Sequence, residues 1–336
     1  MANDIEANFM HLSFLSFDEV VNVMKYEPLE NFVNLLENGL IEDMNALNNK
    51  GDTYFMVACD EGLVDCARVL IEDGADVDLE SALHKACHKG HIDIIKLLLI
   101  CGVELEEQGG TNHLPLIVAC EQGDLEAVEL CIERGLDINS RFDGDVLIVS
   151  YEANQMNIVA WLLEHNYDVS YVSDEHPEDN PLIRACDDGC TELVRLLLDH
   201  GADVNIAAGW YDGSGHDGVN GLPAFPLLAA CRHGHVETIH LLIQREADVN
   251  LNSGSALAIA AQNGHLGAAM LLIESGACVN SSRSTGTYSA LMAASDNGHI
   301  EVARLLLDKG ADINLTVDEN SALYLASEGS HVDVHP

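Results

Sequence analysis

The sequence is poor in positive charge and in aromatic side chains. Its 336 residues contain 15 Lys and Arg against 56 Asp and Glu, which gives a formal net charge of −41. A surface of this sign repels the phosphates of nucleic acids and of anionic lipids, so we expect neither as a partner. Aromatic residues make up 5% of the chain. A core built mainly from Leu, Ala, Ile and Val favours closely packed helices over a β-sandwich.

The sequence also lacks the long apolar runs of exported and membrane proteins. The first 21 residues contain no basic segment, and Asp18 and Glu19 interrupt their apolar stretch, so we do not expect a signal peptide. No apolar run approaches the length that a bilayer span requires. We therefore expect a cytoplasmic protein, with the nucleus as a second possibility.

Motifs of the common enzyme classes are missing as well. The chain contains no G-x-x-x-x-G-K, G-x-S-x-G, H-E-x-x-H or C-x-x-C pattern. One cofactor pattern, G-x-G-x-x-G, occurs at Gly213, Gly215 and Gly218. A dinucleotide site needs a helix that opens at the third glycine, whereas Pro223 and Pro226 interrupt the residues that follow. We therefore predict no cofactor and no enzyme activity.

What the sequence has in abundance is an internal repeat. The segment SALHKACHKGHIDIIKLLLICGVEL from Ser81 is closely similar to SALMAASDNGHIEVARLLLDKGADIN from Ser289. The same frame returns about every 33 residues and starts again at Thr53, Leu114, Asp145, Asn180, Phe225, Ser255 and Ser321. A period sustained over nine units indicates supersecondary units that stack on one another, because one unit is too small to bury its own apolar face.

Each unit contains the signals of two short helices. A Ser or Thr at the start of a unit is expected to cap the first helix, as at Thr53, Ser81, Ser255 and Ser289. A glycine then supplies the positive φ of a tight reversal, and a second glycine ends the second helix. Asparagine replaces both glycines of the fourth unit, at Asn154 and Asn166, and Glu246 replaces the terminal glycine of the sixth.

These elements resemble the ankyrin repeat family, whose T-P-L-H-x-A-A, G-H, L-L and G-A-D-V-N sequences are recognisable from about Gly51 to Val334. The resemblance implies an all-α fold, a solenoid of stacked helix-turn-helix units with β-hairpin-like fingers. We expect residues 1–17 to be a flexible N-terminus and residues 18–50 a degenerate helical cap broken at Pro28. Residues 51–336 are then the repeat array, with eight complete repeats and a truncated ninth whose end frays.

The ten cysteines are expected to be free thiols. Five of them occupy the same place in their units, directly after the alanine of the first helix: Cys59, Cys87, Cys120, Cys186 and Cys231. Equivalent positions in stacked helices lie about 8–10 Å apart, beyond the roughly 7 Å that a disulfide allows. They are interpreted as small core residues, which suits a reducing compartment.

The segment LHKACHKGH places His84, His88 and His91 at helical spacings. A zinc site needs three or four convergent ligands. The resemblance instead implies that His84 and His91 form hydrogen bonds with backbone groups and that His88 is merely exposed. We therefore expect no metal at these residues.

Two surfaces are candidates for binding a partner. The first is the glycine-rich finger at residues 206–224, which carries Trp210, Tyr211 and His216. Large aromatic residues are enriched at interface hot spots, and insertions in repeat proteins gather on the binding face. The alternative for Trp210 is that its ring folds back onto the neighbouring finger.

The second surface is formed by the ends of the first helices, which the resemblance places on a concave face. It is acidic at Asp60, Glu61, Glu121, Asp187 and Asp188, and basic at His88, Lys89, Arg232 and His233. This pattern predicts a mostly basic partner segment that carries some acidic residues. The alternative is that the acidic residues only keep a long array soluble.

The sequence thus predicts a monomeric scaffold or adaptor that binds a partner protein or peptide on its concave face and fingers. A second hypothesis is that the array is the regulatory ankyrin domain of a longer enzyme or channel, whose catalytic part is absent from this chain. Fold alone does not separate these two functions.

Overall fold

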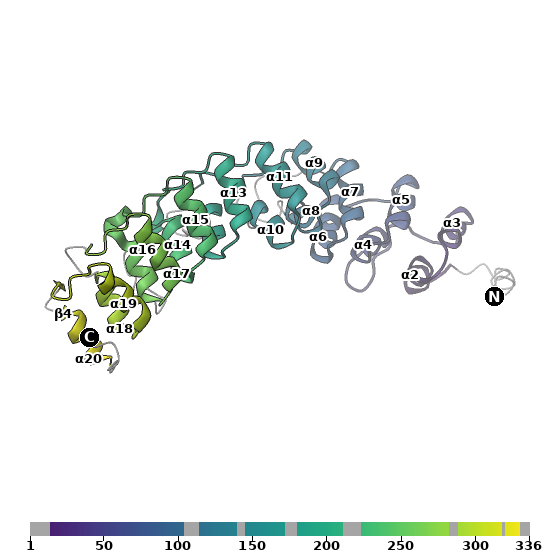
Figure 1. Ribbon diagram of the computed structural model, residues 1–336. Coiled ribbons are helices and arrows are strands. Elements are labelled where there is room, and N and C mark those ends of the chain that lie inside the picture. Colours follow the sequence, from purple (N-terminus) through teal and green to yellow (C-terminus); the bar gives the residue numbers. More distant parts are fainter. Residues whose placement is uncertain are drawn as a thin grey trace. The chain divides into compact units, whose positions relative to one another are not determined.

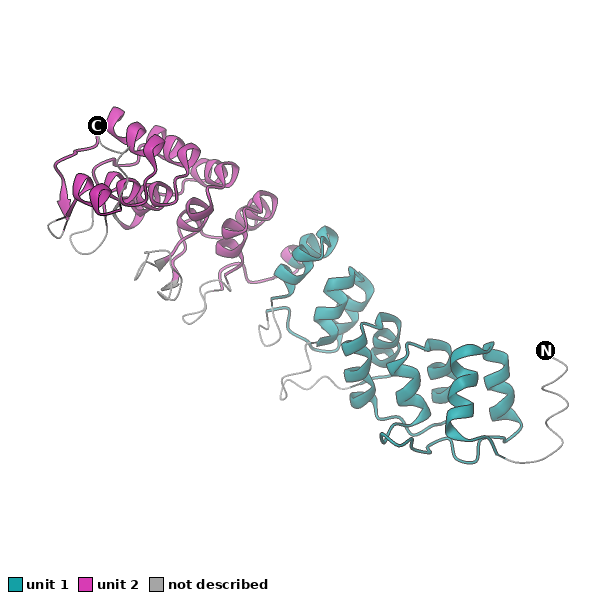
Figure 2. Cartoon of the chain, turned by 90° about the horizontal axis from the view of Figure 1, so that it is seen from below, with its two compact units in different colours: residues 1–162 teal, residues 163–336 magenta. Residues whose placement is uncertain are grey.

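The computed structural model describes residues 14–103, 114–139, 145–171, 180–210, 223–281, 288–317 and 320–329. Short helices connected by turns and loops make up most of these residues (Figure 1). The chain divides into two compact units, residues 1–162 and 163–336 (Figure 2). Within the described residues the strands are two or three residues long. The predicted all-α fold is therefore confirmed.

Unit 1 begins with two helices that are separated at Glu27 and Pro28, as predicted. Its helices are α2 (Phe17–Tyr26), α3 (Leu29–Glu37), α4 (Tyr54–Asp60), α5 (Val64–Glu72), α6 (Leu79–Lys89), α7 (Ile92–Ile100), α8 (Leu114–Gln122), α9 (Leu125–Glu133), α10 (Val146–Glu152) and α11 (Met156–Glu164). Helices α4, α6, α8 and α10 contact one another in sequence order, and α3, α5, α7 and α9 form a second row. The apolar sides of the two rows form the core between them.

Unit 2 repeats this arrangement. Its elements are α12 (Pro181–Asp187), α13 (Thr191–Asp199), β1 (Ala208–Trp210), β2 (Pro223–Ala224), α14 (Pro226–His233), α15 (Val236–Gln244), α16 (Leu251–Gln262), α17 (Leu266–Glu274), α18 (Ala290–Asp296), α19 (Ile300–Asp308), β3 (Thr316–Val317), β4 (Asn320–Ser321) and α20 (Ala322–Glu328). The first row consists of α12, α14, α16, α18 and α20, and the second of α13, α15, α17 and α19. The frayed end expected for the chain falls on residues 330–336, which lie outside the described residues.

The helix caps follow the sequence in part. The side chains of Thr53 and Ser289 accept hydrogen bonds from the backbone N–H three residues later, as predicted. The prediction is wrong at Ser81, because Asp78 caps α6 and accepts the bond from the backbone N–H of Ser81. It is also wrong at Ser255, which lies inside α16 and donates its hydroxyl to the carbonyl oxygen of Asn252. In both cases the helix begins earlier than predicted, after Asp78 for α6 and after Asn250 for α16.

The backbone conformations expected at the irregular reversals are present. Asn154 and Asn166 have φ values of 60° and 66°, and Glu246 has a φ of 68°. Asparagine tolerates the left-handed region, whereas a glutamate there is strained by about 1 kcal/mol.

Several of the reversals after the first helices are tied to the next repeat by a side-chain hydrogen bond. In unit 2 the Nε2 of His235 donates to the carbonyl oxygen of Asp187 at 2.9 Å, and His265 donates to Arg232 in the same way. The equivalent bond joins His91 to Asp60, His299 to Gln262 and Gln155 to Glu121. Gln122, at the end of α8, instead donates to the carbonyl oxygen of Gly90. These bonds hold adjacent first-helix ends at fixed positions.

Aspartates that recur at one place in the fingers stabilise turns. Their side chains accept a hydrogen bond from the backbone N–H two residues later at Asp137, Asp168, Asp203, Asp248 and Asp312. The backbone N–H of Asp76 donates to Oδ1 of Asn45 in the preceding segment, as those of Asp248 and Asp312 donate to Asn205 and Asn280.

The cysteines are free thiols, as predicted, and the five that share one place in the repeat are buried. Burial raises the pKa of Cys59 and of Cys87 to about 12, and it raises the pKa of Cys186 well above its usual value. Thiols in this state are neutral and unreactive. Cys101 and Cys278, by contrast, are exposed.

Candidate functional site

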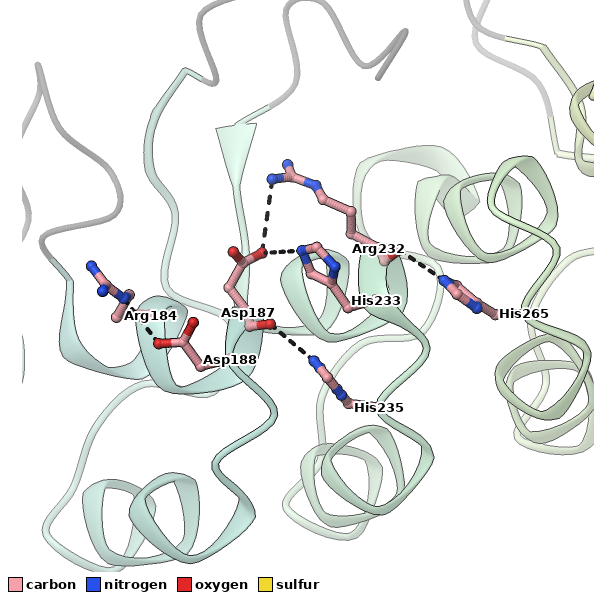
Figure 3. A network of polar contacts seen from close by, with 7 residues as sticks. All are labelled: Arg184, Asp187, Asp188, Arg232, His233, His235 and His265. Carbon is pink, nitrogen blue, oxygen red and sulfur yellow. Dashed lines mark hydrogen bonds and ion pairs between the residues drawn. The ribbon is translucent and has the colours of Figure 1, made fainter. Parts of the chain in front are cut away.

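Four of the predicted residues meet in unit 2, where two first helices end side by side (Figure 3). Asp187 and Asp188 end α12 and its cap, and Arg232 and His233 end α14. The preceding residue in each helix is a buried cysteine, and the following one is a glycine with a φ of 71° or 70°. The buried face of each helix therefore ends at the cysteine, and the side chains of the two residues that follow lie at or near the surface. We call these four residues the unit 2 cluster.

The unit 2 cluster is connected by ion pairs across the two repeats. Oδ1 of Asp187 lies 3.5 Å from Nε2 of His233 and 3.8 Å from Nη1 of Arg232. Nε of Arg184, one turn earlier in α12, donates to Oδ2 of Asp188 at 2.9 Å. The structure therefore brings both signs of charge into contact at one point of the surface.

The acceptor side of the cluster is incompletely satisfied. Oδ1 of Asp187 is shielded from solvent, and it has no hydrogen-bond donor among the described residues. Its two neighbours, the guanidinium of Arg232 and the imidazole of His233, lie within 4 Å, and the Arg232 side chain is only 15% exposed. A shielded acceptor without a donor costs free energy. The Asp188 side chain, by contrast, is 48% exposed and therefore accessible to a bound molecule.

The corresponding residues of unit 1 are not brought together in this way. We call Asp60, Glu61, His88 and Lys89 the unit 1 cluster. Glu61 pairs with Nζ of Lys25 at 2.6 Å, and this pair points to the preceding helix α2. His88 instead bonds to His84, with their Nε2 atoms 3.0 Å apart.

This bond corrects part of the prediction for the histidines. His88 is exposed, as expected, whereas the bond expected between His84 and a backbone group is replaced by one between the two rings. The reason is their spacing of four residues, which places both on one face of α6. The expectation for His91 is confirmed by its bond to the carbonyl oxygen of Asp60.

Glu121, the remaining acidic candidate of unit 1, is exposed at the end of α8. Its carbonyl oxygen accepts the bond from Gln155, so its backbone is fixed while its carboxylate is turned to solvent.

The finger is described only at its base. Trp210 lies in β1, where the backbone pairs with β2 in the register Trp210 to Pro223 and Ala208 to Ala224. This ladder ends directly before Phe225, the residue that caps α14. Tyr211 and His216 lie outside the described residues. The base of the finger is therefore joined to the helix that carries Arg232 and His233.

Two residues of the charged contacts, Arg184 and Lys25, were not predicted from the sequence. Arg184 stands four residues before Asp188, a spacing that favours an ion pair on a helix and was visible in the sequence. Lys25 and Glu61 are 36 residues apart, and only the packing of α2 against α4 places them together.

The described residues show neither a metal cage nor a membrane span. No group of three or more His, Cys, Asp and Glu side chains converges on a common point in them. None of their helices has the length and apolar character that a bilayer crossing requires.

Comparison with known proteins gives consistent matches. The model of "Ankyrin repeats (3 copies)" matches residues 23–109, 78–142, 116–208, 212–283 and 281–335. The ankyrin repeat protein nuc-2 of Neurospora crassa is 28% identical over 160 residues, which are 45% of this chain and 15% of that protein. Ankyrin repeat and SOCS box protein 16 of Mus musculus is 29% identical over 208 residues, 48% of this chain and 45% of that protein.

A bacterial relative is matched over more of its length. The putative ankyrin repeat protein YahD of Escherichia coli is 25% identical over 164 residues, which are 45% of this chain and 81% of that protein. The chain thus spans less than half of the Neurospora and mouse relatives. The family model, however, covers nearly all of this chain. The chain belongs to the ankyrin repeat family.

Proposed function

We propose that the chain is a non-enzymatic scaffold or adaptor that binds a partner protein or peptide through the unit 2 cluster and the adjacent finger. Ankyrin repeats are in general protein–protein interaction modules. The observation that carries the choice of surface is the contact between acidic and basic side chains of two repeats in the unit 2 cluster, where the Asp188 side chain is 48% exposed. A partner cation that reaches this exposed carboxylate forms a charge-assisted hydrogen bond.

The proposed partner is a mostly basic segment that also carries an acidic residue. A Lys or Arg of the partner reaches Asp187 and Asp188, and a carboxylate of the partner reaches Arg232 and His233. The net charge of −41 steers basic segments towards the chain and makes their association depend on salt. We propose that the chain acts as a monomer in the cytoplasm or the nucleus.

The mechanism is binding to a surface that is formed in advance. The bonds from His235 to Asp187 and from His265 to Arg232 fix the backbone under the cluster before any partner arrives. Little conformational entropy is then lost on association. The buried Leu, Ile, Ala and Cys side chains of α12 and α14 add to this rigidity.

Selection of binding peptides from a random displayed library tests the proposal. We expect the selected peptides to be rich in Lys and Arg and to bind the intact chain at least about tenfold more weakly at 200 mM than at 50 mM salt. Asp187→Asn with Asp188→Asn should weaken binding about tenfold or more, as measured by calorimetry. Glu61→Gln is the matched control and should bind like the wild type. A flat salt profile, or equal loss in the control, contradicts the proposal.

The finger is tested separately. Trp210→Ala, and deletion of residues 206–224, should weaken binding of the same peptides while the melting temperature of the Trp210 variant stays within a few degrees of wild type. If Trp210→Ala lowers the melting temperature and leaves binding unchanged, the ring packs onto its neighbour and the finger is not part of the interface.

A second candidate function is that the array regulates a longer enzyme or channel. It is supported by relatives in which the matched repeats are a small part, such as the 6% of "Ankyrin repeat and KH domain-containing protein mask-1" of Caenorhabditis elegans. An antibody raised against residues 180–281 and applied to a native extract tests it. A band well above 36.3 kDa supports this function, and a band at that mass favours the scaffold.

A further inference from the structure

Two histidines on α6 are arranged unlike any others in the described residues. His84 and His88 are one turn apart on the exposed face of the helix. Their Nε2 atoms lie 3.0 Å apart, and the ring planes are nearly perpendicular at 89°. Neither ring is buried, so both nitrogens are accessible to a small ion.

The helix under this pair is held firmly. Asp78 caps its start, and Gly90 ends it in a left-handed conformation. The opposite face of α6 is buried through Ala82, Leu83, Ala86 and Cys87. The helix therefore keeps the two histidines one turn apart on one exposed face, where a single ion can contact both rings.

The distance between the nitrogens suits two adjacent ligands of one transition-metal ion. With metal–nitrogen bonds of about 2.0–2.1 Å, a separation of 3.0 Å subtends about 90–97° at the metal. A tetrahedral angle would separate the nitrogens by about 3.3–3.4 Å. The pair thus fits the right angles of square-planar or octahedral coordination, which Cu²⁺ and Ni²⁺ adopt with nitrogen ligands.

The surrounding charges favour a cation. Glu80 is exposed and lies one turn before His84 on the same face of α6. The ammonium group of Lys85, the residue between the two turns, is held by Asp52 at 2.9 Å. Lys89 follows His88 in sequence but lies about 100° further around the helix. A divalent ion at the histidines therefore meets one carboxylate and no ammonium group on the same face.

We propose that His84 and His88 form a bidentate, exchangeable site for Cu²⁺ or Ni²⁺. Both rings bind through Nε2 as neutral imidazoles, and the ring that donates its Nε2 proton in the free protein carries that proton on Nδ1 instead. No net proton is lost. The remaining positions on the metal are filled by water or by a donor side chain of a bound protein, so this site differs from a zinc cage with three or four protein ligands.

Titration of the intact chain with CuCl₂ tests the proposal, with glycine present to compete for Cu²⁺ that is held by a single imidazole. Electron paramagnetic resonance and calorimetry follow the binding. One Cu²⁺ should bind more tightly than all others, with a spectrum of at least two nitrogen ligands. Its affinity should fall about tenfold or more in His84→Asn and in His88→Asn, because each removes the chelate.

Two control variants make the result specific. His240→Asn removes an exposed histidine of α15 that has Val236 and Gln244 one turn away, and it should leave the tightest site unchanged. The double variant His88→Asn, Lys89→His keeps the number of histidines but moves one off the face of His84, so it should lose the tightest site. Retention of that site by the double variant, or by either single variant, overturns the proposal. Equal melting temperatures in the presence of a chelator show that all variants are folded.

Discussion

The two clusters begin from the same sequence frame and differ in how their charges pair. In both units an acidic pair ends one first helix and a basic pair ends the next: Asp60 and Glu61 before His88 and Lys89, then Asp187 and Asp188 before Arg232 and His233. In unit 2 the acidic and basic pairs contact each other across the repeats. In unit 1 Glu61 turns back to Lys25, and His88 bonds within its own helix.

This difference teaches what the repeat fixes and what it leaves free. The frame fixes the buried thiol before each cluster, the glycine after it, and the backbone bond from the next repeat. The partners of the charged side chains between them depend on which neighbouring side chains lie within reach. In unit 1 these neighbours are Lys25 and His84, which have no counterpart in unit 2. The exposed ends of the first helices can therefore vary in function while the array stays the same.

The largest expected effect tests the buried thiols that both clusters share. Burial raises the pKa of Cys59 and Cys87 to about 12, whereas an unfolded thiol titrates near pH 8.5, roughly. Above that pH the unfolded chain has released the proton and the folded chain still holds it. The contribution of each buried thiol to the free energy of unfolding is thus fully present below the pKa of the unfolded thiol. As the pH rises from there towards the folded pKa, the free energy of unfolding falls by about 1.4 kcal/mol per pH unit for each thiol.

We therefore expect the urea midpoint to drop steeply between about pH 9 and pH 11. Cys186→Ala should show a shallower slope than wild type, by the contribution of one thiol, whatever its stability at pH 7. Cys278→Ala is the control, because that thiol is exposed and should not alter the slope. If Cys186→Ala and Cys278→Ala show the same slope, the thiols are not the cause of alkaline unfolding.

A smaller effect is expected at the glycine that follows each acidic pair. A Cβ atom at Gly189 would lie 2.5 Å from Nδ1 of His235, and one at Gly62 would lie 2.8 Å from Nδ1 of His91. Gly189→Ala thus combines an unfavourable positive φ with displacement of the histidine that bonds Asp187. We expect it to lower the free energy of unfolding by about 2–3 kcal/mol, and Gly62→Ala by a similar amount.

Gly201 provides the matched control. Its φ is 90°, but a Cβ atom there would have nothing within 4 Å, so Gly201→Ala should cost only about 1–2 kcal/mol. Urea unfolding of the three variants measures the difference. If Gly201→Ala and Gly189→Ala lower the free energy of unfolding by the same amount, the bond from His235 to Asp187 contributes nothing to stability. The reversals common to both units would then be stabilised by backbone conformation alone.

These same residues show which structural features the sequence predicts and which it does not. The period predicted the helix pairs, the buried Cys59 and Cys186, and the positive φ of Asn154, because those follow from local propensity and stacking. It did not predict that Asp78 would replace Ser81 as a cap, because both are good capping residues and only the short connector decides between them. Nor did it predict the partners of Glu61 and Asp187, since an exposed charge has several neighbours within reach and its pairing depends on packing distances.

The smallest expected effect compares the pairing of the acidic residues directly. Asp187→Asn keeps the side-chain volume and the carbonyl bond to His235, but it removes the carboxylate beside Arg232, whose side chain is 15% exposed. We expect a loss of about 1 kcal/mol, because this pair is partly shielded from water. Glu61→Gln removes a pair whose glutamate is 42% exposed and should cost less than about 0.5 kcal/mol.

Thermal unfolding at 50 and 500 mM salt distinguishes the two variants, since added salt should abolish the cost of Glu61→Gln and leave most of that of Asp187→Asn. Equal costs in both variants would mean that the pairing in unit 2 is as weak as that in unit 1, and the contact between acidic and basic side chains would then no longer single out unit 2 as the binding surface.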